Sequence, residues 1–226
     1  WERKGLRSDR GVGRLGVVPS DVERTTGRRR VLDAAAERFV RQGYAGTTLR
    51  QIAAAAGIKA GSVYHHFASK EELFVAVLHD GIAVMVHAFD ATVADSPDTD
   101  PVDVRLTAHV RAHLGAVFEH GPYTTAHVTS FFNAPPEVRA TVVPERDDYE
   151  LKWAELFEQM FPGVDAHSLR LRRLILFGAM NATVEWFDPH GKLPLDELAS
   201  TISDQFLNGV THHYDHAPTT HMSSTL

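Results

Sequence analysis

Residues 57–73, with the sequence GIKAGSVYHHFASKEEL, bring several hydrogen-bonding side chains into a short segment. Ser62, Tyr64 and His65 supply hydroxyl and imidazole groups, and Lys70 adds a cation. Hydroxyl and imidazole groups can bond to the edges of DNA bases, whereas lysine and the free amides of a helix N-terminus favour phosphate. The chemistry that this segment indicates is non-covalent recognition of a polyanion.

The chain also has 14 histidines, which raises the alternative of a metal site. His109 and His113 are four residues apart, a spacing at which two imidazoles on one helix can share an ion. A catalytic zinc motif would place a glutamate directly after the first histidine, and Val110 stands there. We therefore expect no functional metal and no cofactor, with these imidazoles exposed or lining a pocket.

Catalytic motifs are absent from the sequence. It contains no Gly-x-Ser-x-Gly and no Walker-type Gly-Lys-Ser/Thr loop, and GVGRLG at residues 11–16 follows no strand pattern. The absence of cysteine excludes disulfides, thiolate metal sites and a cysteine nucleophile. We expect no catalytic residue and no enzyme activity; a helical enzyme or metal-binding protein stays the alternative from another functional class.

These side chains must be positioned by helices, because apolar residues recur at three- and four-residue intervals along most of the chain. The fold class is predicted to be all-α with about nine helices. The expected helices cover residues 28–42, 48–56, 60–67, 69–95, 102–119, 123–132, 137–161 (interrupted near Pro144), 167–187 and 195–214.

The second and third of these helices are short and are separated by a break that contains Gly57. Thr48 and Gln51 have the form of a capping box that starts the second helix. Gly57 suits the left-handed turn, and Gly61 at the start of the third helix lets the backbone approach a phosphate. With a packing helix before them, these are the parts of a helix-turn-helix, whose second short helix enters the major groove.

Residues 47–73, TTLRQIAAAAGIKAGSVYHHFASKEEL, resemble the DNA-binding signature of the TetR family of bacterial transcriptional regulators. The resemblance implies a homodimer of all-helical subunits, an N-terminal domain that binds double-stranded operator DNA, and a C-terminal domain that binds a small-molecule effector. Ser62 and His65 would face base edges. The whole set assigned to DNA is Thr47, Thr48, Lys59, Gly61, Ser62, Tyr64, His65 and Lys70. Lys59 stands where many relatives have a small hydroxyl residue, which predicts a weaker helix cap and an additional phosphate contact.

Charge is divided unevenly along the chain. Residues 1–80 carry a net charge of +5 and residues 81–226 carry −11, within a total of −6. A basic N-terminal third on an acidic remainder indicates a DNA-binding head on a body with another task. The expected domains are a flexible basic arm (1–26), a helix-turn-helix domain (27–73), an effector-binding and dimerisation domain (74–214) and a disordered tail (215–226). A cytoplasmic location and no membrane partner are expected.

The predicted effector cavity lies in the body. Histidine and asparagine side chains in otherwise apolar helices need buried partners. The candidate walls are Met85, Phe89, His109, His113, Phe118, Phe131, Trp153, Phe157, Asn181 and Trp186. Residues 145–159 and 181–199 resemble TetR-family repressors that respond to acyl-CoA thioesters, although Asp188 stands where a basic residue is common. The resemblance implies an acyl-CoA effector that releases the repressor; a hydrophobic drug or a free acid is the alternative.

Two C-terminal helices carry apolar stripes that predict a dimer interface. Small residues in the first stripe permit close helix approach, and the stripes could otherwise be intramolecular core. The interface residues predicted are Leu171, Leu174, Ile175, Gly178, Ala182, Leu198, Ile202 and Phe206. Together these features predict a ligand-responsive DNA-binding repressor.

Overall fold

The structure is a computed structural model that describes residues 21–208, with side chains described from residue 26 onward. This range contains nine α-helices, two short 3-10 helices and no β-strand, which confirms the all-α fold class. Residues 21–26 belong to the first helix and not to the predicted arm. The rest of the arm and the predicted tail lie outside the described residues.

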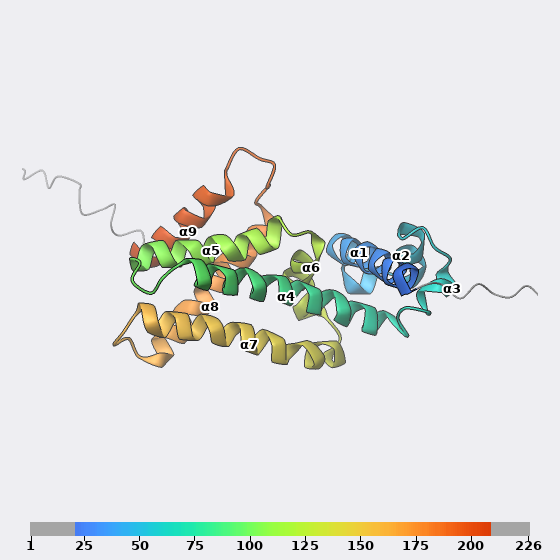
Figure 1. Cartoon of the computed structure of the whole chain (residues 1–226), viewed down its shortest axis with the longest axis horizontal. Coiled ribbons are helices and arrows are strands. Elements are labelled where there is room, and N and C mark those ends of the chain that lie inside the picture. Colours follow the sequence, from blue (N-terminus) through green and yellow to red (C-terminus); the bar gives the residue numbers. More distant parts are fainter. Residues whose placement is uncertain (1–20, 209–226) are drawn as a thin grey trace, which may run out of the picture.

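Three helices form the head of the molecule (Figure 1): α1 (Asp21–Gly46), α2 (Leu49–Ala55) and α3 (Ala60–Val63). Gly43 has φ 67°, so the chain changes direction where the sequence predicted the end of the first helix. Thr48 and Gln51 form the expected capping box at α2. Gly57 also has φ 67°, which confirms its left-handed turn between α2 and α3.

Helix α4 (Lys70–Asp95) runs from the head into the body. The Ser69 hydroxyl caps it by accepting from the Glu72 amide, while the Glu72 carboxylate accepts from the Ala68 amide. By length and hydropathy α4 could cross a membrane, a test that buried core helices also pass. It contacts α1, α5, α6 and α7, and this packing explains its apolar character.

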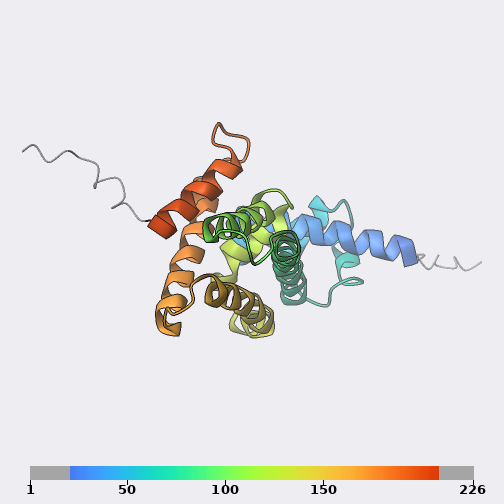
Figure 2. The same ribbon diagram turned by 60° about the vertical axis from the view of Figure 1, so that its left-hand side comes forward.

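The body consists of α4, α5 (Val102–Phe118), α6 (Pro122–Ser130), η1 (Phe131–Asn133), α7 (Pro136–Met160), α8 (Ala166–Ala182), η2 (Thr183–Glu185) and α9 (Leu195–Asn208). Helices α4, α5 and α7 run side by side, α8 lies across α7, and α9 covers α5 (Figures 1 and 2). The interruption predicted near Pro144 was wrong, because α7 continues through that proline.

Two hydrophobic cores meet along α4. The first contains the head helices, residues Leu73 to Leu78 of α4, the buried apolar side chains of α6, and the start of α7. The second begins at Ile82 and contains α5, α8, α9 and the rest of α7. The packing therefore changes between residues 78 and 82, a few residues beyond the domain boundary expected from the sequence.

Candidate nucleic-acid interface and ligand cavity

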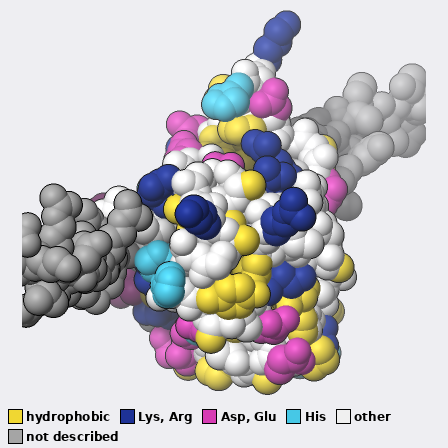
Figure 3. All heavy atoms as spheres, turned by 90° about the vertical axis from the view of Figure 1, so that its right-hand side faces the viewer, with side chains coloured by type: hydrophobic (Ala, Val, Ile, Leu, Met, Phe, Trp, Pro, Cys, Tyr) yellow, Lys and Arg dark blue, Asp and Glu magenta, His cyan; other side chains and the backbone are white. Residues whose placement is uncertain are grey.

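The exposed end of the head carries six of the eight predicted DNA-binding residues. Lys and Arg side chains gather over this end (Figure 3). Thr48, Lys59, Gly61 and His65 are exposed, and Ser62 is half-buried. Tyr64 is 60% exposed although it is a large aromatic residue. These positions offer hydroxyl, imidazole and ammonium groups to the outside.

Two side chains that were predicted to contact phosphate make hydrogen bonds within the head instead. Thr47 is 1% exposed, and its hydroxyl donates to the carbonyl of Gly43 at 2.8 Å. Lys70 donates from Nζ to the carbonyl oxygens of Tyr44 and Thr47, both at 3.0 Å, and lies over the Tyr44 ring. The structure therefore corrects both assignments: in this conformation the two side chains fix the junction of α1, α2 and α4 and do not face outward.

The start of α3 has open space around its backbone. Lys59 is the N-cap residue and makes no side-chain capping bond, as its residue type predicted. A β-carbon at Gly61 would meet no protein atom within 4 Å, so no neighbour within the protein demands glycine there. His66 is directed at α1, because a β-carbon at Gly27 would lie 3.0 Å from its Nε2. This histidine supports packing of the head.

An arginine run at the start of the head was not singled out from the sequence. Arg28 lies over the Phe67 ring, with Cζ 4.8 Å from its centre, and Arg30 donates to the carbonyl of Ala56 at the end of α2. Arg29 pairs with Asp33 and Asp80, at 3.1 and 3.3 Å. Their contacts link α1 to Phe67, to the end of α2 and to α4. All three arginines are also exposed, so they add positive charge to the surface of the head.

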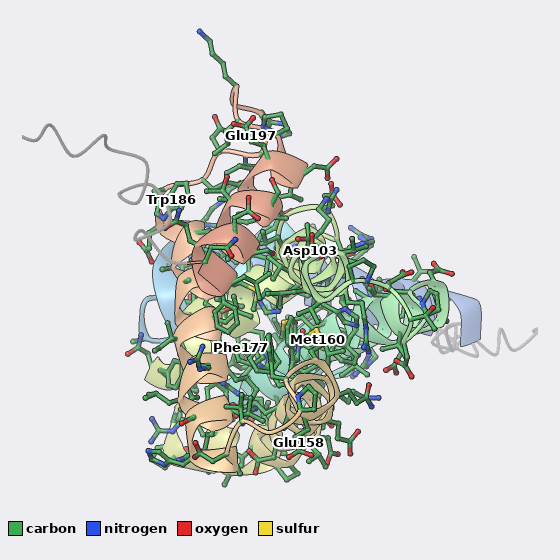
Figure 4. All side chains as sticks on the ribbon, turned by 90° about the vertical axis from the view of Figure 1, so that its left-hand side faces the viewer. Asp103, Glu158, Met160, Phe177, Trp186 and Glu197 are labelled. Carbon is green, nitrogen blue, oxygen red and sulfur yellow. The ribbon has the colours of Figure 1, made fainter. Side chains whose placement is uncertain are left out.

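A cavity of about 420 Å³ lies among α4, α5, α6, α7 and α8. Three of the ten predicted wall residues line it: Met85, His113 and Asn181. Phe177 of α8 points into the interior, as does Met160 of α7, whereas Glu158 and Glu197 point outward (Figure 4). The complete lining is Ile82, Met85, His113, His127, Val128, Phe132, Arg146, Tyr149, Glu150, Leu174, Phe177, Gly178 and Asn181.

The other seven predicted wall residues are not part of the lining of this cavity. Trp153 and Phe157 have no exposed surface and fill the second core, while Phe131 belongs to the first. Phe118 packs on Phe187, and Trp186 is 60% exposed. Phe89 and His109 line a separate, smaller cavity of about 180 Å³. Periodicity identified these residues as inward-facing but could not distinguish a cavity wall from a filled core.

A chain of hydrogen bonds runs along one wall of the cavity among α4 to α8. The Tyr149 hydroxyl donates to Nδ1 of His113 at 3.0 Å, and Nε2–H of His113 donates to Oδ1 of Asn181 at 3.1 Å. Because the Asn181 oxygen can only accept, this arrangement requires the neutral Nε2–H tautomer. Burial lowers the pKa of His113 to about 4, which keeps the ring neutral. Both ring nitrogens of His113 are therefore satisfied.

Charged groups lie on one side of the cavity. The Arg146 guanidinium is 4.0 Å from the centre of the Phe131 ring and 5.2 Å from that of Phe132. Its nearest carboxylate oxygen, on Glu150, is 3.8 Å away, and that carboxylate also pairs with Arg173 at 3.3 Å. Burial lowers the pKa of Arg146, and its loosely held charge is available to an anionic group.

An apolar stripe on the outer face of α8 includes the first set of predicted interface residues. Leu171, Leu174 and Ile175 are 54%, 42% and 60% exposed, and Gly178 and Ala182 are also exposed. On α9 the prediction fails for Leu198, which is 4% exposed and fills the protomer's own second core. Ile202 and Phe206 are half-buried against the same core, since the apolar face of α9 packs on α5.

Among the described residues, no group of three or more His, Asp or Glu side chains is arranged to hold a metal ion. His109 and His113 face different cavities, because Nδ1 of His109 is directed at the carbonyl of Arg105 and Nδ1 of His113 at Tyr149. The i, i+4 spacing that raised the metal alternative therefore does not bring the two rings to one site.

Comparisons with known proteins agree on one family. Residues 31–77 match "Bacterial regulatory proteins, tetR family", and residues 99–210 match "Tetracyclin repressor-like, C-terminal domain". The HTH-type transcriptional repressor KstR2 of Mycobacterium tuberculosis is 27% identical over 188 residues, which cover 80% of this chain and 91% of that protein.

Two solved structures extend the comparison over the whole fold. The ketosteroid transcriptional regulator KstR2 of M. tuberculosis has a TM-score of 0.65 at 26% identity and covers 80% of this chain and 93% of that one. AibR, solved in complex with isovaleryl coenzyme A and operator DNA, has a TM-score of 0.69 at 23% identity and covers 79% and 97%. The AibR comparison supports the fold alone.

Proposed function

The chain belongs to the TetR family of bacterial regulatory proteins, and we propose that it is a cytoplasmic repressor whose dimer leaves its operator when an acyl-CoA thioester enters the α4–α8 cavity. Proteins of this family are DNA-binding regulators and not enzymes. The observation that carries the proposal is the cavity itself, with its apolar walls and an arginine beside them, built on helices that also hold the head.

Operator binding is assigned to the exposed residues of α3 and its flanks. Lys59 and Tyr64 would contact phosphate, and Ser62 and His65 would face bases when α3 lies in the major groove. The open backbone at Gly61 admits a phosphate oxygen without displacing a side chain. Because most of this affinity comes from phosphate neutralisation, binding should weaken as salt rises.

Dimerisation is assigned to the α8 stripe, since contiguous exposed apolar surface is costly in a monomer. Leu174 and Gly178 belong both to this stripe and to the cavity lining. A partner packed on α8 would therefore close one side of the cavity. We assign the half-buried Ile202 and Phe206 to the protomer's own core and not to the dimer interface.

The cavity dimensions fit the acyl part of a thioester. Its volume of about 420 Å³ lies in the range of roughly 300–1,000 Å³ that is usual for small-molecule sites. Ile82, Met85 and Phe177 would contact the acyl chain, and Arg146 would attract a phosphate. A free acid is the second candidate, because one guanidinium beside one glutamate suits a single carboxylate better than several phosphates.

Release from DNA is assigned to α6, which connects the cavity to the head. His127 of α6 lines the cavity and donates from Nδ1 to the carbonyl of Leu78 in α4 at 2.9 Å. One turn earlier, the Tyr123 hydroxyl donates to Asp33 of α1. A ligand that favours a different position of α6 would shift both contacts and so the separation or tilt of the two heads in the dimer.

The test is a mobility-shift titration with the DNA upstream of the protein's own gene at two salt concentrations. Tyr64→Ala and Lys59→Ala should weaken binding, whereas Lys192→Ala, the same charge change on an exposed residue far along the chain, should not. Octanoyl-CoA and octanoate are then added separately. Release by the thioester supports the full proposal, release by the acid alone favours the second candidate, and equal binding by all three variants refutes the DNA assignment.

A further inference from the structure

Two histidines, His113 and His127, line the cavity among α4 to α8, and only His127 has a ring nitrogen, Nε2, without a partner among the described residues. The side chain is 3% exposed, and its Nδ1 faces the carbonyl oxygen of Leu78 at 2.9 Å. A carbonyl oxygen can only accept, so the Nδ1 atom must carry the proton. Nε2 is then left with a lone pair, and the ring lines the cavity.

Burial defines the protonation state of the His127 ring, and stacking on Phe131 defines its orientation. Burial is the main reason that the pKa of His127 falls to about 4, so the ring is neutral at physiological pH. The ring also stacks on Phe131, with centres 5.7 Å apart and planes 16° apart. Nε2 is therefore a positioned acceptor that cannot become a donor by taking up a proton near pH 7.

His113 and Tyr149, which also line the cavity, differ from His127. His113 has partners on both nitrogens, and the Tyr149 hydroxyl donates to one of them. Nε2 keeps accessible surface at the cavity wall, so a ligand that covers this acceptor without supplying a donor leaves it buried and unpaired, which is unfavourable. Around it, Ile82, Met85 and Val128 supply an apolar surface.

We propose that the effector carries a hydroxyl or amide N–H group and donates a hydrogen bond from it to Nε2 of His127. This inference rests on the proposed role of the cavity as the effector site. It makes His127 a specificity-determining residue: an apolar molecule of equal shape but without a donor would leave the buried lone pair unpaired and would bind more weakly.

The direct test uses a matched pair of small probes, 4-ethylphenol and 4-ethylanisole. Both carry an oxygen on the same apolar body, but only the phenol has a donor. Dissociation constants measured by ligand-observed NMR or calorimetry on the full chain should favour the phenol by about 5- to 20-fold. Equal binding of the two probes, or binding of neither at millimolar concentration, overturns the inference.

Two substitutions at His127 distinguish the role of Nδ1 from that of Nε2. The amide of His127→Asn can still donate to the Leu78 carbonyl but does not reach the Nε2 position, so the phenol preference should fall to within about twofold. His127→Gln places an amide oxygen near the Nε2 position and should restore part of the preference. His87→Asn, the same change at an exposed position on α4, is the control and should keep it. A full preference in His127→Asn would contradict the assignment.

A pair of thioesters then tests which part of an acyl-CoA effector supplies the hydrogen-bond donor. Tighter binding of 3-hydroxyoctanoyl-CoA than of octanoyl-CoA places the donor on the acyl chain. Equal affinity of the two, with both weakened in His127→Asn, places it on the amide groups of the pantetheine arm. If neither thioester binds while the phenol preference holds, the acyl-CoA proposal fails and the inference about His127 stands.

Discussion

Replacing Gly81 by alanine is expected to force α6 away from α4. A β-carbon there would lie 2.5 Å from the carbonyl oxygen of Tyr123 and 2.9 Å from Cβ of His127. Carbon atoms in good contact are roughly 3.5–4.0 Å apart, so the helices must separate by about 1 Å. Two of the closest atoms belong to backbone and cannot rotate away.

The expected loss follows from three contributions. Overpacking of this kind costs about 1–3 kcal/mol. The hydrogen bonds from Thr124 to the Gly81 carbonyl and from His127 to the Leu78 carbonyl cross the same contact, and weakening them adds about 1 kcal/mol. The higher helix propensity of alanine offsets about 1 kcal/mol of this loss of stability. A net loss of about 1–3 kcal/mol should lower Tm by roughly 3–10 °C for a chain of this size.

Thermal unfolding followed by circular dichroism, at one fixed protein concentration, measures this loss. Gly61→Ala is the matched control, because a β-carbon at this α3 position meets no atom within 4 Å and the residue lies outside the proposed dimer interface. Its Tm should stay the same or rise by a few degrees. If Gly81→Ala melts within 1 °C of the unchanged protein, the close approach of α4 and α6 is not what limits this position.

Three further predictions concern the dimer, the head and the buried histidines. Ile175→Arg should convert dimers to monomers, as measured by light scattering. Leu151→Arg, at an equally exposed apolar residue on α7, should not. If both variants remain dimers, α8 is not part of the dimer interface. Lys70→Met should lower the free energy of unfolding by about 1–3 kcal/mol, because the partly buried carbonyls of Tyr44 and Thr47 lose the bonds from Nζ. An unchanged denaturation midpoint would mean that these bonds do not stabilise the head and would support the original phosphate assignment of Lys70. His113 and His127 have folded-state pKa values of about 4, below the usual 6.5. The unfolded chain therefore binds more protons, and stability should fall as pH decreases from 6.5 to 4. Urea midpoints that stay constant over this range would mean that neither ring is buried in its neutral form.

The helices and the head were predictable because their signals are local. Thr48 with Gln51 marks a cap and Gly57 marks a left-handed turn, and each depends on only a few neighbouring residues. Pro144 shows the limit of local reasoning. Proline removes one donor from α7, but the packing of that helix on α4 and α8 keeps it continuous.

The cavity was only partly predictable, because its walls come from five helices that are distant in sequence. Polar residues in apolar stripes correctly indicated His113 and Asn181, since a buried polar group needs a partner. The same reasoning did not single out His127, which lies in a short helix with few apolar residues. Lys70 shows the reverse error: its position in a DNA-binding signature suggested phosphate, but two carbonyls of the head lie within its reach.

The sharing of one core by the head, α6 and the start of α7 has a consequence for protein engineering. Sensor domains are often exchanged by cutting between a DNA-binding module and its ligand-binding module. In this chain a cut at residue 73 would separate Leu73 from Phe74 and Val77 and would remove Tyr123 and Val138, which complete the same apolar cluster. A fusion that is to keep this operator specificity should carry α6 and the first turns of α7 together with α1–α4, because the reading head and its support are one unit of packing.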